Sequence, residues 1–474
     1  MFSMKQIQKL TKISSRIRSF AAFLIVIISL ITGCSEKAPE KPNVLLIIVD
    51  TLRADHIGCY GGRKGVSPSL DKLASQGVQF MNAYSTAPWT QPAVASILTS
   101  LYPTEHGVVK LFDTLSSGNN TFAERLQRVG YLTGAIISHK FIGSKFGFSQ
   151  GFDYFNERNA RGHQAITSQE VTRDAIQWLA NNKDRSFFLM LHYFDPHYVY
   201  QHHQEFNYIK GYQGSLKPGE NIEALRDKRK LMTKADVRFL QDLYDEEISY
   251  TDKQIGVLMD YLAEAGLKEK TLIVFTADHG EEFMTHGWIG HTRTLYEELV
   301  HVPLIFSYPR WFRTSRVESQ VSIIDILPTV LDLLGVPYDD ADLSGISLGK
   351  NLNYIEASNK GHPIFFEVSF GNVDGREDLE AKGETAFKKA VLENQWKLIH
   401  DEITDQLEIY NIAEDPAETK NLIDSVPHIR THLESYLKAW SHLLKNSKNR
   451  HEQQRTISPS DKELEELKAL GYIQ

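Results

Sequence analysis

The segment NVLLIIVD occupies residues 43–50 and joins seven mostly apolar residues, rich in branched side chains, to a single aspartate. A continuous apolar run of this length is typical of a strand buried on both faces, as in a parallel sheet. Similar runs recur as TGAIIS (133–138), FFLMLHY (187–193), TLIVFTAD (271–278) and VPLIFSY (302–308). The sequence therefore predicts several strands of one buried sheet.

Helical patterns separate these runs. Apolar residues recur three and four positions apart in SQEVTRDAIQWLANN (168–182) and over residues 233–266, where Thr233 is a plausible N-cap and Gly266 a plausible C-cap. Strands that alternate with helices predict an α/β fold with a central, mostly parallel sheet.

The pattern changes after about residue 340. FKKAVLENQWKLIHDE (387–402) and QLEIYNI (406–412) predict antiparallel strands, and residues 425–446 form an amphipathic pattern typical of a helix. We therefore expect a larger α/β domain over 43–340, a smaller C-terminal α+β domain over 341–445, and a charged tail over 446–474.

The first residues follow the pattern of a secretory signal. Basic residues precede the apolar run 20–33, which is short for a membrane span. The run closes on ITGC, which resembles the lipobox of bacterial lipoproteins, so residues 1–33 are expected to be a signal peptide, Cys34 a lipidated N-terminus, and 34–42 a tether. The alternative is an uncleaved membrane anchor. Both place the protein in the bacterial cell envelope, on the periplasmic or cell-surface side.

Cysteine content and charge narrow the class of protein further. The chain has two cysteines, so Cys59 lacks a partner if Cys34 carries lipid, and no disulfide is expected. The formal net charge of −8 over 474 residues gives no electrostatic reason to expect a nucleic acid partner.

Residues able to do chemistry follow three of the predicted strands. Asp50 ends the first run, Asp195 and His197 follow the run at 187–193, and Asp278 and His279 end the run at 271–278. Ligands of open α/β sheets bind beyond the carboxyl ends of strands. One such aspartate could simply cap a helix. A cluster of them would repel and lose hydration unless it held a cation, which predicts a divalent metal site.

PWTQPAVASILTS (88–100) adds a hydroxyl to this group. Pro92 fits the first turn of a helix, which makes Thr90 the N-cap or its neighbour. A hydroxyl there faces the positive end of the helix dipole, as would an anion bound beside it. If Thr90 only caps the helix, its replacement by Ala would cost roughly 1 kcal/mol of stability and no activity.

Six segments, read in order, resemble the sulfatase family of the alkaline phosphatase superfamily. They are PNVLLIIVDTLRADHIGCYG (42–61), TQPAVASILTSLYPTEHGV (90–108), FTADHGEEF (275–283), HTRTLYEELVHVPLIF (291–306), IIDILPTVLDLLGV (323–336) and LEIYNIAEDPAETKNL (407–422). The resemblance implies an α/β sandwich with a central sheet, a smaller C-terminal domain, one or two divalent metals, and attack of a metal-bound nucleophile on a sulfate or phosphate ester.

The chain departs from the family pattern at the nucleophile. The family signature has a Cys or Ser that becomes formylglycine, then Pro and Arg, whereas the aligned residues here are Thr90, Pro92 and Val94. Thr cannot become formylglycine, and a Thr sulfate would lack the exit that the aldehyde hydrate provides. The paired Asp of the family is here Asp50 followed by Thr51. A Thr nucleophile with an Asp-His metal pair instead resembles the nucleotide phosphodiesterases and phosphoethanolamine transferases of the superfamily.

The resemblance and the chemistry together suggest roles for the metal site. Asp50, Asp278 and His279 are expected to hold a cation that also binds Thr90 and lowers the pKa of its hydroxyl. The mixed nitrogen and oxygen donors favour zinc or manganese, while calcium or magnesium remains possible.

A second group is expected around the substrate. Asp195, His197 and His291 could bind a second metal, or could contact the ester oxygens and protonate the leaving group. Arg53 is similar to a residue of the phosphonate monoester hydrolases and could neutralise substrate charge, or could only pair with Asp55. His139 and His286 are weaker candidates.

The expected function is a membrane-tethered, metal-dependent hydrolase or transferase of sulfate or phosphate esters, with Thr90 as nucleophile. Substrates would be a sulfated or phosphorylated small molecule, glycan or lipid head group, and the Thr favours phosphoryl substrates on chemical grounds. The alternatives are a phosphodiesterase or phosphoethanolamine-transferase-like enzyme, and an inactive surface binding module, since Val94 supplies no guanidinium.

Overall fold

The structure is a computed structural model that describes residues 41–161, 166–349, 362–369, 387–447 and 456. From Pro42 onward the chain forms one compact unit. The predicted signal peptide, Cys34, most of the tether and nearly all of the predicted tail lie outside the described residues.

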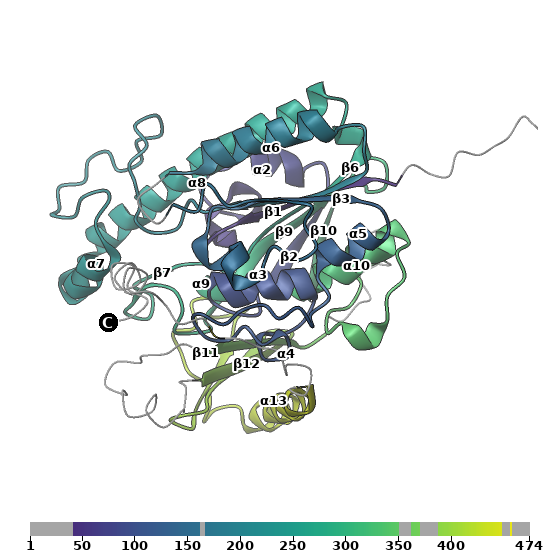
Figure 1. Cartoon of the computed structure of the whole chain (residues 1–474). Coiled ribbons are helices and arrows are strands. Elements are labelled where there is room, and N and C mark those ends of the chain that lie inside the picture. The colour runs from purple at the N-terminus through teal and green to yellow at the C-terminus, as the bar shows by residue number, and fades with distance from the viewer. Residues whose placement is uncertain (1–40, 162–165, 350–361, 370–386, 448–455, 457–474) are drawn as a thin grey trace, which may run out of the picture. The chain divides into compact units, whose positions relative to one another are not determined.

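An eight-stranded sheet forms the centre of this unit, with the strand order β10-β2-β9-β6-β1-β5-β3-β4 (Figure 1). Its strands are β1 (Asn43–Val49), β2 (Val78–Tyr84), β3 (Leu132–Ile136), β4 (Tyr154–Asn156), β5 (Phe187–Tyr193), β6 (Thr271–Ala277), β9 (His301–Ser307) and β10 (Ser315–Ser322). All the residues of β1, β5 and β6 are buried, as their apolar runs predict.

The sheet is mostly parallel, which confirms the expected α/β fold. β1 pairs in parallel with β5 and with β6, so the carboxyl ends of these three strands meet at one edge. Only β9 runs the other way among the described strands of this sheet, since it pairs antiparallel with β2 and β6. Its apolar run indicates burial on both faces and carries no information on direction.

Helices cover both faces of the sheet (Figure 1). On one face lie α2 (Pro68–Ala74), α6 (Ser168–Asn182) and α8 (Lys234–Glu264), and on the other lie α3 (Thr90–Thr99), α5 (Phe122–Arg128) and α10 (Ile326–Leu334). α8 begins as predicted, because the side chain of Thr233 accepts a hydrogen bond from the Asp236 amide. Gly266 follows the helix with a positive φ of 67°, a conformation that glycine adopts without steric cost.

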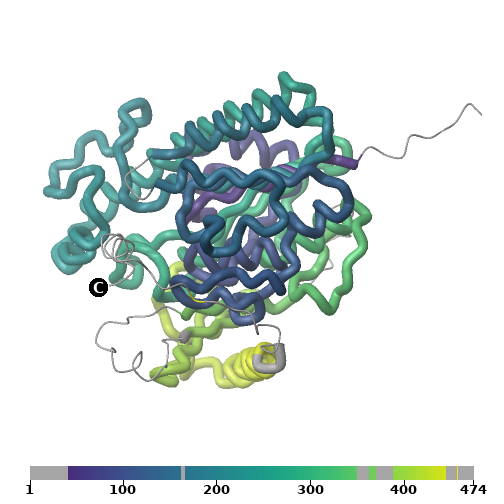
Figure 2. Tube along the Cα trace, in the orientation of Figure 1, coloured from purple at the N-terminus to yellow at the C-terminus, as the bar shows by residue number. Residues whose placement is uncertain are grey.

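A smaller antiparallel sheet carries the C-terminal part of the fold, as predicted. Its strands are β11 (Ile364–Ser369), β12 (Phe387–Glu393), β13 (Trp396–Asp401) and β14 (Gln406–Asn411), and α13 (Pro427–Ser447) packs on them. Figure 2 shows this yellow-green part against the blue segment that includes α4 (Pro103–His106). Tyr102 and Ile324 belong to its apolar core, so the two sheets are packed together.

Buried polar contacts also join the two sheets. The ammonium group of Lys397 on β13 lies 3.0 Å from carboxylate oxygens of both Glu297 and Glu418. Glu367 on β11 accepts hydrogen bonds from the amide and hydroxyl of Thr104, both at 2.6 Å. Lys397 has no exposed side-chain surface, so these contacts are shielded from water.

Two further observations concern the membrane and the cysteines. No helix within the described ranges combines the length and apolar character needed to cross a bilayer.

Cys59 is partly buried and forms no disulfide with any described residue. Burial raises the pKa of its thiol to about 12, which makes it a poor nucleophile near neutral pH.

Candidate active site

The carboxyl ends of the central strands bring two aspartates together. Asp50 follows β1 and Asp278 follows β6, and neither has any exposed surface. The Asp278 Oδ1 atom accepts hydrogen bonds from the amides of Thr51, at 3.2 Å, and His279, at 2.8 Å. Asp278 is therefore fixed against the turn that follows β1.

That turn has an unusual backbone conformation. Thr51 has a φ of 56°, in the left-handed region that branched residues rarely adopt. The conformation accompanies the hydrogen bond from its amide to Asp278. Strained backbone of this kind is commonly found at functional sites, where the surrounding structure holds it in place.

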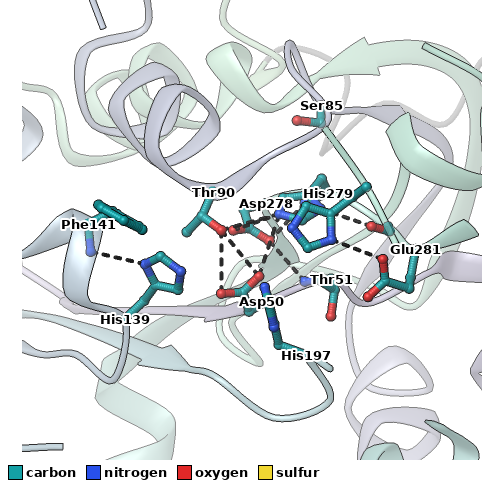
Figure 3. Close-up of polar contacts among 12 residues, drawn as sticks. Asp50, Thr51, Ser85, Thr90, His139, Phe141, His197, Asp278, His279 and Glu281 are labelled. Atoms are coloured by element: carbon teal, nitrogen blue, oxygen red, sulfur yellow. Dashed lines mark hydrogen bonds and ion pairs between the residues drawn. The ribbon is translucent and has the colours of Figure 1, made fainter. Parts of the chain in front are cut away.

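Thr90 lies beside these carboxylates. α3 begins at Thr90 with Trp89 as its N-cap, so Thr90 is the neighbour of the cap. Its Oγ1 atom lies 3.3 Å from Asp50 Oδ1 and 3.3 Å from His279 Nε2. The three side chains face one another in Figure 3, and the hydroxyl contacts side chains at the strand ends.

The surroundings of the two carboxylates fit a divalent cation. Asp50, Asp278 and His279 each place one ligand atom within 4.8 Å of the others. Asp278 Oδ2 is buried and has no hydrogen-bond partner in the described part of the chain. Burial raises the pKa of Asp50, and the nearby Asp278 carboxylate raises it further. Two buried carboxylates that repel each other and leave one oxygen unsatisfied are stabilised by a positive ion.

A second group of side chains lies next to this triad. The ring of His291 lies 4.5 Å from that of His279 and 4.9 Å from that of His197, measured between ring centres. The structure thus brings His197 and His291 to the triad, as the sequence predicts. Burial lowers the pKa of His291 well below its ordinary value, so its imidazole is neutral near pH 7.

Glu281 orients His291. Its Oε1 atom lies 2.9 Å from His291 Nδ1, and both side chains are fully buried (Figure 3 labels Glu281). This contact holds the His291 ring in one orientation beside the triad. Burial raises the pKa of Glu281 to about 8.

Asp195 occupies a different position. Its Oδ2 atom accepts hydrogen bonds from the Thr167 amide and from the amide and hydroxyl of Ser168, at the start of α6. Asp195 therefore binds the first amides of the preceding helix α6, rather than capping the next helix as the sequence allows for a single aspartate.

Arg53 pairs with Asp55, the second of the two roles that its sequence position suggests. Its Nε and Nη2 atoms lie 2.9 and 2.8 Å from the two carboxylate oxygens of Asp55, and its Nη1 atom donates to the Glu281 carbonyl and to Glu298. Arg53 and His286 line a separate cavity of about 240 Å³. Within that cavity wall His286 stacks on Tyr296, with ring centres 3.5 Å apart.

Two other positions complete the set. His139 lies beside the site, with its ring centre 6.1 Å from those of His192 and His197, and its Nδ1 accepts a hydrogen bond from the Phe141 amide (Figure 3). Val94 is fully buried in α3.

Sequence reasoning misses Glu281 and His192. Glu281 could have been found, because it is an acidic residue four positions after the end of β6. His192 lies inside the apolar run of β5, where an aromatic side chain indicates core packing.

Comparison with known proteins agrees with this geometry. The sulfatase family model matches residues 42–336, and the model of the N-sulphoglucosamine sulphohydrolase C-terminal region matches residues 284–442. An N-acetylglucosamine-6-O-sulfatase of Bacteroides thetaiotaomicron is 25% identical over 484 aligned positions, which cover 82% of this chain and 84% of the relative. A choline-sulfatase of Rhizobium meliloti is 24% identical and covers 81% and 83%.

Solved structures share the fold. A protein in complex with its substrate D-glucosamine-2-N,6-O-disulfate superposes with a TM-score of 0.69 at 21% identity, covering 87% of this chain and 100% of the other. The phosphonate monoester hydrolase of Agrobacterium radiobacter gives a TM-score of 0.67 at 21% identity, covering 89% and 98%.

The fold and the matched family define a hydrolase of the sulfatase class. The chain belongs to the sulfatase family.

Proposed function

We propose that this sulfatase-like hydrolase is metal-dependent and uses Thr90 as its nucleophile. The observation that carries the proposal is the position of Thr90 Oγ1, 3.3 Å from both Asp50 Oδ1 and His279 Nε2 in a buried cluster. Asp50, Asp278 and His279 would hold the cation, with zinc or manganese favoured by the nitrogen donor. A cation bound there would lower the pKa of the Thr90 hydroxyl and offset the charge of the ester oxygens.

The protein's own residues then account for the steps of ester cleavage. Thr90 Oγ1 would attack the sulfur or phosphorus atom, form a bond to it, and displace the alcohol oxygen of the substrate. The proton lost by the Thr90 hydroxyl would be taken up by the neutral imidazole of His291, oriented by Glu281, and given to that leaving oxygen. Water would then attack the sulfur or phosphorus atom and break its bond to Thr90; one proton of this water would restore the Thr90 hydroxyl, and the sulfate or phosphate would be released.

His197 would contact the substrate from the other side of His291. Its Nδ1 atom lies 2.7 Å from the Tyr198 carbonyl, which fixes the orientation of the ring. Together the two imidazoles would contact the ester oxygens of the substrate.

The substrate class follows from the family and from the nucleophile. The relatives are an N-acetylglucosamine-6-O-sulfatase and a choline-sulfatase, and the fold is shared with phosphonate monoester hydrolases. We propose a sulfate or phosphate ester of a small molecule, a glycan or a lipid head group. Thr90 favours phosphoryl substrates, because a sulfate ester on Thr cannot be released through an aldehyde hydrate, as it can from formylglycine.

Purified protein assayed with four ester classes tests this proposal. An aryl sulfate, a phosphate monoester, a phosphate diester and a phosphonate monoester should be compared at equal concentration, and mass spectrometry should look for phosphorylated or sulfated Thr90 after acid quenching. Turnover of phosphoryl esters with a trapped adduct on Thr90 is the expected result. Turnover with the adduct on another residue would overturn the nucleophile assignment.

We also propose that the protein is a lipoprotein of the bacterial cell envelope, held by lipid on Cys34. The support is the basic start, the apolar run 20–33 and the ITGC segment of the sequence. Metabolic labelling with a palmitate analogue tests it. Wild-type protein should take up label and partition with membranes, while Cys34→Ser should do neither; equal labelling of both would reject the assignment.

A further inference from the structure

An unpartnered histidine lies inside the central sheet. His192 on β5 has no exposed surface, and neither of its ring nitrogens has a hydrogen-bond partner among the described residues. A buried polar group left without a partner is costly, so such groups usually have a specific role. Its sequence neighbours on β5 are apolar or aromatic, and they offer the imidazole no partner.

Two carboxylates lie near its Nε2 atom. This atom is 3.8 Å from Asp50 Oδ2 and 3.9 Å from Asp278 Oδ2. Both distances are too long for a hydrogen bond. Two ligands that each bind one zinc ion at roughly 2.0–2.2 Å lie about 3–4 Å apart, so the separations match those of neighbouring ligands. Asp278 Oδ2 likewise lacks a hydrogen-bond partner within the described ranges, so two buried atoms that can bind a cation lie 3.9 Å apart.

The sheet register explains how His192 reaches this place. β5 lies beside β1, and His192 pairs with Ile48, two residues before Asp50. Because side chains alternate along a strand, Ile48 and Asp50 have the same orientation relative to the sheet. The residue after Asp50 is Thr51, so the turn after β1 offers one carboxylate only. The neighbouring strand β5 supplies an imidazole beside it.

We propose that His192 is a ligand of the cation, together with Asp50, Asp278 and His279. This inference rests on the proposed metal dependence of the enzyme. Two imidazoles and two carboxylates form a donor set suited to zinc, whereas calcium prefers oxygen donors throughout. The four ligands together therefore favour zinc. Asp50, Asp278 and His279 alone leave the choice of metal open.

X-ray absorption spectroscopy of the zinc-loaded protein tests the proposal, because scattering from imidazole rings reports how many histidines bind the ion. The wild type should show two imidazoles and His192→Ala one. In competition titrations with a zinc chelator, His192→Ala should weaken zinc affinity at least about tenfold. His106→Ala is the matched control, since His106 is also fully buried but contacts Ser96 and the Val108 amide.

The outcomes separate this inference from the proposed function. Absence of stoichiometric zinc from the wild type would reject metal dependence itself. One imidazole in the wild type, or equal zinc affinity of the wild type and His192→Ala, would reject the role of His192 while leaving the Asp50, Asp278 and His279 site intact. If His192→Ala fails to fold, the imidazole count of the wild type still decides the question.

Discussion

Thr90 Oγ1 lies 3.3 Å from His279 Nε2, although 189 positions separate the two residues in the chain. Thr90 begins α3, whereas His279 lies two residues after the end of β6, so only the assembled sheet brings them together.

Replacement of Thr90 separates chemistry from helix capping. Thr90→Ala should lower kcat at least about 10³-fold, while Thr90→Ser should keep a hydroxyl in place and retain most of the activity. Steady-state kinetics on a phosphate ester would measure both. Because α3 has no side-chain cap bond at its start, neither variant should lose much stability, and thermal unfolding serves as the control. Equal kcat values in all three proteins would contradict the assignment.

Removal of the metal should abolish activity and lower stability. A ligand present at about 100 times its Kd stabilises the native state by about 2.7 kcal/mol, and a chelator removes this contribution. We expect EDTA to lower the Tm of the wild type and zinc or manganese to restore both Tm and activity. Asp278→Asn should be insensitive to EDTA, since it has lost a ligand. A wild-type Tm and activity unchanged by EDTA would argue against a bound cation.

Glu281 should act through His291. Glu281→Ala should lower kcat about 10- to 100-fold with little change in KM, because the imidazole loses its orientation. Glu281→Gln keeps an oxygen that can accept from Nδ1 and should restore much of the rate. In a double-mutant cycle, Glu281→Ala should add little to the effect of His291→Ala. Full additivity of the two losses would show that Glu281 acts independently.

Glu367 should make stability depend on pH. Burial raises the pKa of its carboxyl from 4.5 to about 7, so the folded state binds this proton more tightly than the unfolded state. The associated stability is present below pH 4.5 and is lost as the pH rises toward 7, a change on the order of 3 kcal/mol. Glu367→Gln should flatten this part of the profile in urea unfolding measured from pH 4.5 to 7.5. An unchanged slope would contradict the shift.

Lys397 should be essential for joining the two sheets. Lys397→Met leaves Glu297 and Glu418 without their shared cation and should cost about 3–5 kcal/mol, as removal of one partner from a buried ion pair does. Adding Glu418→Gln to this variant should recover part of the loss. Chemical denaturation of the three proteins measures the effect, and a cost below 1 kcal/mol would show that the cluster is dispensable.

The sequence predicts the central strands and the metal triad because both leave strong local patterns. Buried strands appear as uninterrupted apolar runs, and the reactive side chains come directly after them. The edge strand β10 and its neighbour β2 are missed, since SRVESQVS and VQFMNAY mix polar with apolar residues. His192 is missed because it lies inside an apolar run, where a buried histidine is interpreted as a residue of the hydrophobic core.

Some assignments needed the three-dimensional arrangement. Asp195 and Asp278 both follow buried strands, yet one accepts bonds from the start of α6 and the other faces Asp50. Arg53 is three positions from Asp50 but extends to Asp55 and Glu298. The direction in which each of these side chains extends depends on neighbouring helices and loops. The periodicity of the sequence does not predict it.

The contact between Lys397 and Glu297 bears on how such proteins could be recombined. Glu297 follows closely on the segment that carries Glu281 and His291, and its amide also donates to Glu418. A chimera that exchanged only the C-terminal strands with those of a relative would bring in foreign partners for Glu297. Such a graft should therefore include residues 280–298, so that the recipient inherits the histidine loop together with the sheet that supports it.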